Sequence, residues 1–188
     1  MEYHKINSIF KRNMAGDKKF IIGEYSNPEL EYLKDNDWVF TEKVDGTNIR
    51  VMWNGQDITF GGKTDNAQMP MFLLYKLKEL FEGEEKKKLF DNIFGKAKLG
   101  DIDFPLRICL YGEGYGAKIQ KGGGNYISNG VSFVLFDVQI GGIYLERENI
   151  EDIAQKLGID IVPIIGHGTL DDAIQMVKKG FNSKWGNF

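Results

Sequence analysis

The chain has 188 residues, which is enough for one domain with a hydrophobic core and short for two domains of ordinary size. Its 42% apolar and 27% charged residues are typical of a soluble globular protein, and a formal net charge of −3 argues against non-specific binding of nucleic acid by the whole surface. No apolar run has membrane-spanning length, the N-terminal residues do not form a signal-peptide core, and a single cysteine excludes an internal disulfide, so we expect a cytoplasmic protein.

The first part of the chain predicts short strands and one short helix. Phe20–Ile22 is apolar and predicts a strand. Asn27 followed by Pro28 is typical of a helix start, because asparagine caps free backbone N–H groups and proline fits the first helical position. We expect this helix to continue to about Leu33. Trp38–Phe40 predicts the next strand.

A predicted hairpin follows, and it carries a lysine. Ile49–Trp53 alternates apolar residues as a strand does, and Asp45-Gly46 between it and Trp38–Phe40 is a strong hairpin signal. Lys43 stands just before this turn, near the mouth of the predicted sheet. A lysine is a nucleophile when burial or neighbouring cations suppress its charge. The same residues also fit a surface hairpin with a solvated lysine.

The middle of the chain predicts a third strand, a glycine-rich turn and two helices. Ile58–Phe60 is the strand, and the turn after it carries Lys63. Residues 71–80 and 84–94 have the apolar spacing of amphipathic helices. We expect an irregular connection over residues 94–104. Lysines cluster between Lys86 and Lys121, in the middle of the chain, and fit either a local basic groove or an ordinary solvated face.

An apolar strand is predicted at Leu106–Tyr111, and we expect it to end in the glycines of Gly112–Gly116. Glu113 stands between two of these glycines. A carboxylate flanked by glycines at a strand end is typical of a site where a ligand approaches the backbone closely. The glycines alone would also suggest a phosphate loop, but no convincing helix follows to offer its N-terminus to a phosphate. We expect Lys118–Gly124 to be a mobile, basic loop.

Val131–Val138 predicts a buried strand with Phe136 and Asp137 near its end. On its own, Phe136 in such a strand fits the hydrophobic core. The remaining elements are predicted as scaffold: a helix over residues 147–157, a strand over Ile159–Ile165, and a helix that starts at Thr169 and continues to about Lys179.

Three of these segments together resemble the motifs of one enzyme group. Glu42-Lys43-Val44-Asp45-Gly46-Thr47-Asn48 resembles motif I of the covalent nucleotidyltransferases, the ATP-dependent ligases and capping enzymes, and is most similar to the RNA ligase 2 family. Tyr111-Gly112-Glu113 resembles motif III of that family, and Phe136-Asp137 resembles motif IIIa. The order and spacing of the three argue against a chance match.

The resemblance implies an α+β fold, the nucleotidyltransferase catalytic domain, with two antiparallel sheets, flanking helices and ATP bound between the sheets. It implies an ATP-dependent RNA ligase that joins 5′-phosphate and 3′-hydroxyl RNA ends and uses Mg²⁺ or Mn²⁺. Lys43 would attack the α-phosphate of ATP and form a lysine-AMP intermediate. The AMP would then pass to the 5′-phosphate, and the 3′-hydroxyl would displace it.

The resemblance also implies roles for the residues around Lys43. Glu42 would read the adenine, Asn48 would support the nucleotide or the RNA 3′ end, and Asp45 and Gly46 would shape the turn. Glu113 would bind the ribose or a metal, Phe136 would stack on the base, and Asp137 would place an acid beside it. Lys63 would contact phosphate or ribose, although the family usually has arginine there and lysine lacks its bidentate fork.

The resemblance covers the first motifs of the family and then stops. We place neither motif IV, with a metal-binding glutamate, nor motif V, with two lysines that bind the α-phosphate. We therefore expect residues 1–188 to form an adenylyltransferase domain that is incomplete at its C-terminus and adenylates itself slowly or not at all. The alternatives are an ATP-dependent DNA ligase, a capping-type nucleotidyltransferase, and a truncated, non-catalytic fragment that binds nucleotide or RNA. No oligomeric state is implied.

Overall fold

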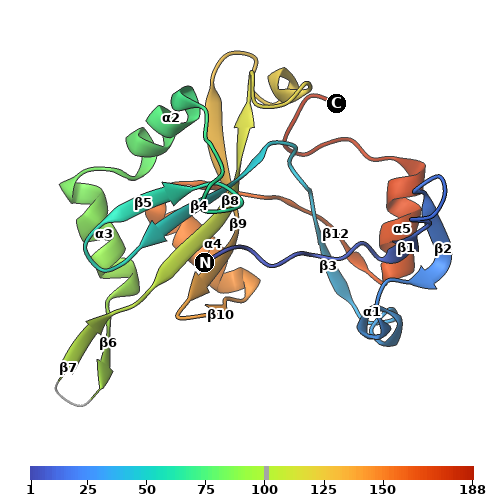
Figure 1. Ribbon diagram of the computed structural model, residues 1–188, viewed down its shortest axis with the longest axis horizontal. Helices are drawn as coiled ribbons and strands as arrows, with labels where there is room; N and C mark the ends of the chain where they lie inside the picture. Colours follow the sequence, from blue (N-terminus) through green and yellow to red (C-terminus); the bar gives the residue numbers. More distant parts are fainter. Residues whose placement is uncertain (100–101) are drawn as a thin grey trace. The chain divides into compact units, whose positions relative to one another are not determined.

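The computed structural model describes residues 1–99 and 102–188, and the chain divides into two compact units (Figure 1). The first unit consists of Met1–Tyr3, Glu42–Pro163 and Ser183–Phe188, and the second of His4–Thr41 and Ile164–Asn182. Within the described residues, no helix combines the length and the apolar character that are needed to cross a bilayer.

A sheet with the strand order β10, β9, β8, β4, β5 forms the centre of the first unit (Figure 1). The strands on this path are antiparallel, and β11 pairs with β9 in parallel. Their bounds are Thr47–Trp53 for β4, Ile58–Gly61 for β5, Ile108–Gly116 for β8, Val131–Ile140 for β9, Ile143–Tyr144 for β10 and Asp160–Ile161 for β11. The unit also has a hairpin of β6 (Lys96–Leu99) and β7 (Ile102–Pro105), and a short 3-10 helix, η1 (Gly123–Asn125).

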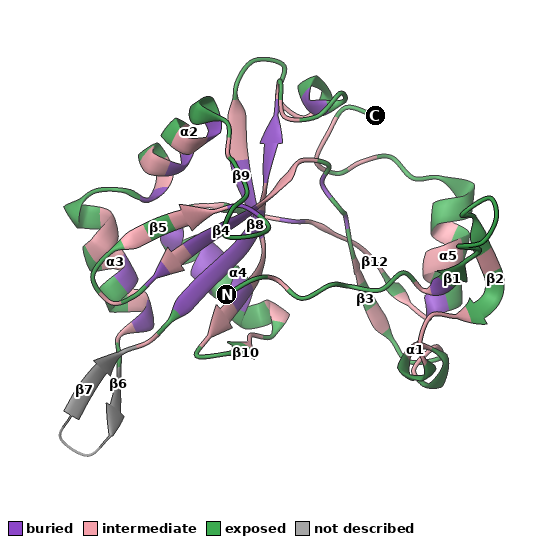
Figure 2. Ribbon diagram, viewed as in Figure 1, coloured by how far each residue is buried: buried purple, intermediate pink, exposed green. Residues whose placement is uncertain are grey.

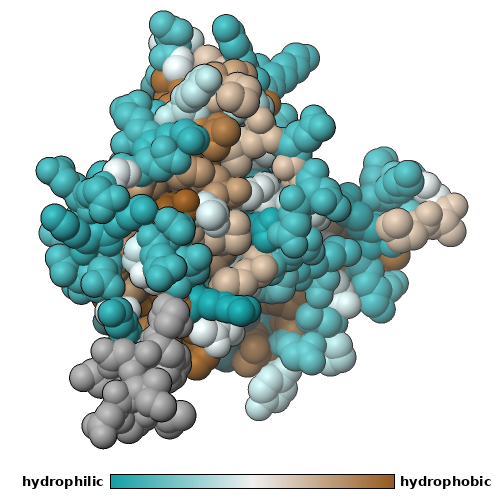
Figure 3. All heavy atoms as spheres, turned by 60° about the vertical axis from the view of Figure 1, so that its left-hand side comes forward, coloured by the Kyte–Doolittle hydropathy of each residue, from teal (hydrophilic) through white to brown (hydrophobic). Residues whose placement is uncertain are grey.

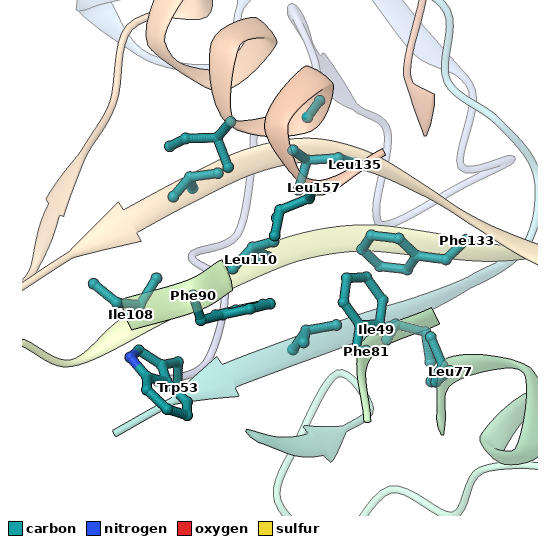
Figure 4. Packing of buried hydrophobic residues seen from close by; sticks show 14 of the residues in the cluster. Ile49, Trp53, Leu77, Phe81, Phe90, Ile108, Leu110, Phe133, Leu135 and Leu157 are labelled. Carbon is teal, nitrogen blue, oxygen red and sulfur yellow. The ribbon is translucent and has the colours of Figure 1, made fainter. Parts of the chain in front are cut away.

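Three helices cover one face of this sheet and bury the main core. They are α2 (Met71–Phe81), α3 (Glu84–Phe94) and α4 (Arg147–Leu157), and Figure 2 shows their buried sides turned toward the strands. Figure 4 shows the aromatic centre of this core, where the Phe81 ring meets the Phe133 ring edge to face at a centroid distance of 5.5 Å. Both predicted helices of the middle region are confirmed, because their apolar spacing matches a buried face.

The glycines of β8 lie under these helices, and their small size has a packing reason. A Cβ on Gly112 would lie 2.2 Å from the Phe133 ring, and a Cβ on Gly114 would lie 2.6 Å from the Leu73 side chain. The strand therefore continues through Gly116. The prediction that the strand ends in these glycines is confirmed, and the glycines make room for neighbours while their backbone stays in the ladder.

The solvent side of α2 carries apolar side chains as well. Met71, Phe72 and Tyr75 are exposed there. Figure 3 turns this part of the first unit forward and shows apolar surface, in brown and tan, among hydrophilic groups. Exposed apolar residues in such numbers are ordinary on a protein surface, and we assign them no role.

The second unit contains two small antiparallel sheets and two helices. β1 (Phe10–Arg12) pairs with β2 (Phe20–Tyr25), and β3 (Trp38–Thr41) pairs with β12 (Ile164–Gly168). The helices are α1 (Pro28–Tyr32) and α5 (Leu170–Lys179). Both helix starts are confirmed: the Asn27 side chain accepts a hydrogen bond from the Leu30 N–H at 2.9 Å, and Thr169 and Asp172 form a reciprocal capping box.

The predicted hairpin around Asp45-Gly46 is wrong. β3 pairs with β12, while β4 pairs with β5 and β8, so residues 42–46 link two strands of different sheets. An Asp-Gly signal predicts only the local turn. The pairing of β3 and β4 is instead determined by contacts with strands far along the chain, β12 and β8.

Two other predicted elements also differ from the structure. The connection predicted as irregular over residues 94–104 contains the hairpin of β6 and β7, and residues 100–101 lie outside the described residues. The strand predicted over Ile159–Ile165 is divided into β11 and β12 around Pro163, which has no N–H to donate to a strand partner.

Candidate active site

Lys43 lies in the irregular segment Glu42–Gly46 of the first unit. Its side chain is exposed, whereas the neighbouring side chains of Glu42 and Val44 are only 5% and 2% exposed. The residues on either side therefore anchor the segment, and the amine remains accessible to solvent. An accessible side chain on an anchored segment can meet a ligand in a fixed position.

The carboxylate of Glu42 is held by residues near the other end of the chain. Its Oε1 accepts a hydrogen bond from the Ser183 hydroxyl, and its Oε2 accepts one from the Lys184 N–H at 2.8 Å. The Glu42 N–H donates to the Pro163 carbonyl at 3.0 Å. Both oxygens of the residue predicted to read adenine thus already accept a hydrogen bond from the chain itself.

The other side of Lys43 is anchored by packing and by two side-chain hydrogen bonds. Val44 belongs to a small buried cluster with Tyr115, Val134 and Val162. The Asp45 N–H donates to the Tyr126 hydroxyl at 3.0 Å. The Gly46 carbonyl accepts from the Gln120 Nε2 at 2.8 Å. Gln120 belongs to the predicted basic loop Lys118–Gly124, which therefore contacts the lysine segment directly.

Glu113 lies beside the lysine segment, on the central strand β8. A Cβ added to Gly46 would lie 2.2 Å from the Gly114 carbonyl and 2.9 Å from the Glu113 Cγ, so Gly46 allows this close approach. Burial raises the pKa of Glu113 to about 7; the Lys43 charge and a hydrogen bond from the Gly46 backbone oppose the rise, and the Asp45 charge adds to it. Glu113 can therefore change its protonation state near neutral pH.

Asn48 lies directly across from Glu113. The two residues are register partners of β4 and β8, and both are on the sheet face opposite the helices because their neighbours Ile49 and Gly114 face the core. The Asn48 Oδ1 is buried and has no hydrogen-bond partner among the residues that the structure describes. A buried acceptor without a partner is costly, and a bound ligand that donates a hydrogen bond would satisfy it.

A bulge in β9 places Phe136 and Asp137 on this same face. The register changes from Tyr111 opposite Asp137 to Gly112 opposite Leu135, which makes Phe136 the extra residue. Because Leu135 and Val138 both belong to the helix-side core, the two residues between them lie on the other side. Phe136 is half-buried.

Tyr3 of the N-terminal segment contacts both of these residues. Its hydroxyl donates to Asp137 Oδ2 at 2.9 Å, and its ring meets the Phe136 ring edge to face at a centroid distance of 5.1 Å. Burial, followed by the neighbouring Asp137 charge, raises the pKa of Tyr3. The N-terminal residues thus fix the orientation of Phe136 and Asp137.

Lys63 is exposed on the turn after β5, and a buried arginine holds that turn. Arg50 is fully buried; its Nε donates to the Gly62 carbonyl at 2.7 Å and its Nη2 to Asp65 Oδ1 at 2.8 Å. Its Nη1 donates to the Met1 carbonyl at 3.1 Å. Among the described residues, Lys63 makes no hydrogen bond or ion pair with the residues around Lys43. A charged residue in mid-strand was the one sequence signal that could have identified Arg50.

The residues around Glu113 fit a divalent cation that is shared with a substrate. No group of three or more histidine, cysteine, aspartate or glutamate side chains in the described part of the chain is arranged to hold a metal. Mg²⁺ is commonly bound by one or two carboxylates, with substrate phosphates and water completing its shell. Glu113, with Asp45 close enough to influence its pKa, could supply one such carboxylate.

The fold and the sequence agree with one family of known proteins. The solved structures that resemble this chain include Naegleria gruberi RNA ligase mutants with AMP and manganese (18% identity, TM-score 0.59, 79% of this chain and 43% of that chain) and with ATP and manganese (19%, 0.59, 80% and 42%). The same ligase with pyrophosphate has 20% identity and a TM-score of 0.58 over 80% of this chain and 43% of that one.

These likenesses confirm the predicted fold, a nucleotidyltransferase domain of antiparallel sheets with flanking helices. The chain spans less than half the length of the ligases that it matches. Among curated protein sequences, none matches. The sequence profile described as RNA ligase matches residues 36–186, which include the lysine segment, β4, β8 and β9. The chain therefore belongs to the RNA ligase family.

Proposed function

We propose that this chain performs lysine adenylation, the first step of ATP-dependent RNA ligation. The Nζ of Lys43 attacks the α-phosphate of ATP, a bond forms between nitrogen and phosphorus, and pyrophosphate leaves. The observation that supports this most strongly is the setting of Lys43, an accessible amine on a backbone anchored from both sides and beside the half-buried carboxyl of Glu113. Family membership supports RNA as the substrate.

The sheet face opposite the helices supplies the nucleotide-binding groups in this proposal. Phe136 stacks on the adenine with Asp137 beside it, and the Asn48 Oδ1 accepts a hydrogen bond from the nucleotide. Glu113 binds the ribose or, in its ionised form, a Mg²⁺ or Mn²⁺ ion. A bound ion would neutralise charge on the phosphates during attack.

Charged residues of the lysine segment and of the turn after β5 complete the site. Lys63 contributes positive charge to the phosphates, held near them by the Arg50-anchored turn. Asp45 and Gly46 shape the backbone beside the nucleophile. Glu42 contacts the adenine with the lone pairs that its two existing hydrogen bonds leave free, because each carboxylate oxygen accepts more than one.

The later steps use the same site. The AMP passes from Lys43 to the 5′-phosphate of an RNA end, and a 3′-hydroxyl then displaces AMP and seals the strand. Each step is an in-line attack on phosphorus, so positioning and charge neutralisation contribute most of the catalysis.

Covalent labelling tests the proposal directly. The chain is incubated with ATP labelled at the α-phosphate and Mg²⁺ or Mn²⁺, and separated under denaturing conditions. Because the motif V lysines are not placed in this sequence, we expect slow labelling: radioactivity that remains with the protein, that acidic hydroxylamine releases, and that the Lys43→Ala variant lacks. Lys19→Ala, which removes an exposed lysine of the second unit, is the matched control and should label like the wild type.

The outcome also separates the alternatives. Label that persists in Lys43→Ala would exclude Lys43 as the nucleophile. Labelling by GTP in preference to ATP would indicate a capping-type enzyme, and sealing of nicked DNA in preference to nicked RNA would indicate a DNA ligase. ATP binding without any label would indicate a non-catalytic nucleotide-binding chain.

A further inference from the structure

Residues 183–188, which we call the C-terminal clamp, contact the lysine segment from several sides. Figure 1 shows this end of the chain beside η1, and the Asn187 N–H donates to the Asn125 carbonyl at 3.0 Å. The Ser183 N–H donates to the Phe188 carbonyl at 2.9 Å, which closes the clamp into a turn. All of these residues belong to the first unit, as does Lys43.

Ser183 is the central residue of this turn. Its hydroxyl donates to Glu42 Oε1, while the same oxygen accepts from the Trp185 N–H at 3.0 Å and the Gly186 N–H at 2.6 Å. The two accepted bonds orient the hydroxyl so that its single hydrogen points at the carboxylate. The Lys184 N–H supplies the second hydrogen bond to Glu42, at 2.8 Å.

The clamp also holds the residues that follow Lys43. Trp185 packs against the buried cluster that contains Val44, and its ring meets the Tyr115 ring at a centroid distance of 6.0 Å. The Phe188 ring meets the Tyr126 ring edge to face at 5.1 Å. Tyr126 in turn accepts the hydrogen bond from the Asp45 N–H. Residues before and after the lysine are thus fixed by one short segment.

The Glu42 carboxylate makes this arrangement sensitive to a single hydroxyl. A carboxylate that is only 5% exposed depends on hydrogen bonds in place of water, and charged acceptors form the strongest ones. Without the Ser183 hydroxyl, Oε1 would lose its partner, and the side chain would have to turn toward water. That movement would displace the backbone next to Lys43, and a nucleophile loses rate steeply when it is misplaced by about 1 Å.

We propose that Ser183 is a positioning residue for the Lys43 nucleophile, acting through Glu42. The inference rests on the proposed function, since it assigns to the clamp the task of aiming the amine that attacks ATP. The role needs a hydroxyl at this position, and it does not require Ser183 to touch the nucleotide.

The test compares Ser183→Ala and Ser183→Thr with the wild-type chain. In single-turnover labelling with ATP, we expect Ser183→Ala to lower the maximum rate about 10- to 100-fold and to change the ATP concentration for half-maximal rate less than about threefold. Ser183→Thr keeps a hydroxyl and should restore the rate to within a few-fold. Ser8→Ala, which removes a serine hydroxyl of the second unit, is the matched control.

Hydrogen exchange gives a second measurement that does not need activity. Amides of residues 42–46 should exchange faster in Ser183→Ala, while those of β4 and β8 keep their protection. Unchanged exchange at residues 42–46, a wild-type labelling rate in Ser183→Ala, or no rescue by threonine would each overturn the inference. If the wild type takes no label, but residues 42–46 still exchange faster in Ser183→Ala than in the wild type, the adenylation proposal is refuted. The role of Ser183 in fixing the lysine segment would then remain supported.

Discussion

Asn48 of β4 and Glu113 of β8 are direct partners across the strand ladder, and each has an unmet requirement in the free protein. The Asn48 Oδ1 is buried without a partner among the described residues, and burial raises the pKa of Glu113 to about 7. An acceptor that needs a donor thus lies opposite a carboxyl that is costly to ionise. A ligand that brings hydroxyl groups and a cation would satisfy both, as a nucleotide with its metal does.

The unsatisfied oxygen predicts an unusual response to Asn48→Ala. Because Oδ1 makes no hydrogen bond in the free protein, we expect its removal to change the free energy of unfolding by less than about 1 kcal/mol. A ligand that does use this oxygen should bind about tenfold more weakly, the equivalent of one hydrogen bond. Urea unfolding and ATP titration measure the two effects. A large loss of stability with unchanged ATP binding would contradict this reading of Asn48.

The pKa of Glu113 predicts that stability falls as the pH rises. In the unfolded chain a glutamate has its ordinary pKa of about 4.5, whereas in the folded chain the pKa of Glu113 is about 7. The folded state therefore holds an extra proton between these values, so this contribution is fully present below pH 4.5 and is lost as the pH rises through 7. Its size is on the order of 3 kcal/mol.

Glu113→Gln isolates this contribution. The glutamine keeps the shape of the side chain and does not titrate, so its free energy of unfolding should change less between pH 5 and pH 8 than that of the wild type. Urea unfolding at both pH values measures the difference. Parallel pH profiles for the two proteins would show that the Glu113 carboxyl is already solvated. The same variant should lose metal-dependent labelling at every pH, because an amide is a poor ligand for Mg²⁺.

The close contact between Gly46 and β8 predicts that even a methyl group is not tolerated there. In Gly46→Ala the new Cβ would lie 2.2 Å from the Gly114 carbonyl, and the Gly114 backbone cannot move away without disturbing its pairing with Thr47 of β4. We expect a loss of roughly 1–3 kcal/mol in the free energy of unfolding and a displaced Lys43. Gly124→Ala is the matched control, because a Cβ there meets nothing within 4 Å. Equal melting temperatures for the two variants would contradict the prediction.

Elements with a local physical cause could be predicted from the sequence. Asn27 and Thr169 mark helix starts because each satisfies free N–H groups a few residues away. The Asp45-Gly46 signal was just as local, but the strand before it pairs with residues more than 120 positions later, at Ile164–Gly168. Strand partners depend on such long-range contacts, and no window of sequence contains them.

The same distinction applies to the site. The structure brings Lys43, Asn48, Glu113 and Phe136 into one unit, three of them on one sheet face, as their motifs suggested. Their roles remain predictions. Ser183 and Tyr126 could not be found from the sequence, because a serine near the chain end and a tyrosine in a loop are ordinary residues. Only their contacts with Glu42 and Asp45 give them importance.

The bulge at Phe136 leads to a prediction that separates base binding from phosphate binding. It presents the ring on the sheet face that carries Asn48 and Glu113, where a purine can stack on it. Phe136→Leu keeps apolar bulk but removes the flat ring, and loss of stacking should weaken ATP binding about 10-fold or more, within the roughly 1–3 kcal/mol that stacking contributes.

Calorimetric titration with ATP and with inorganic tripolyphosphate distinguishes the two parts of the ligand. Tripolyphosphate should bind the variant and the wild type equally, because it has no base. Equal weakening for both ligands would mean that the substitution distorts the sheet face, and unchanged ATP binding would mean that the adenine does not lie on Phe136.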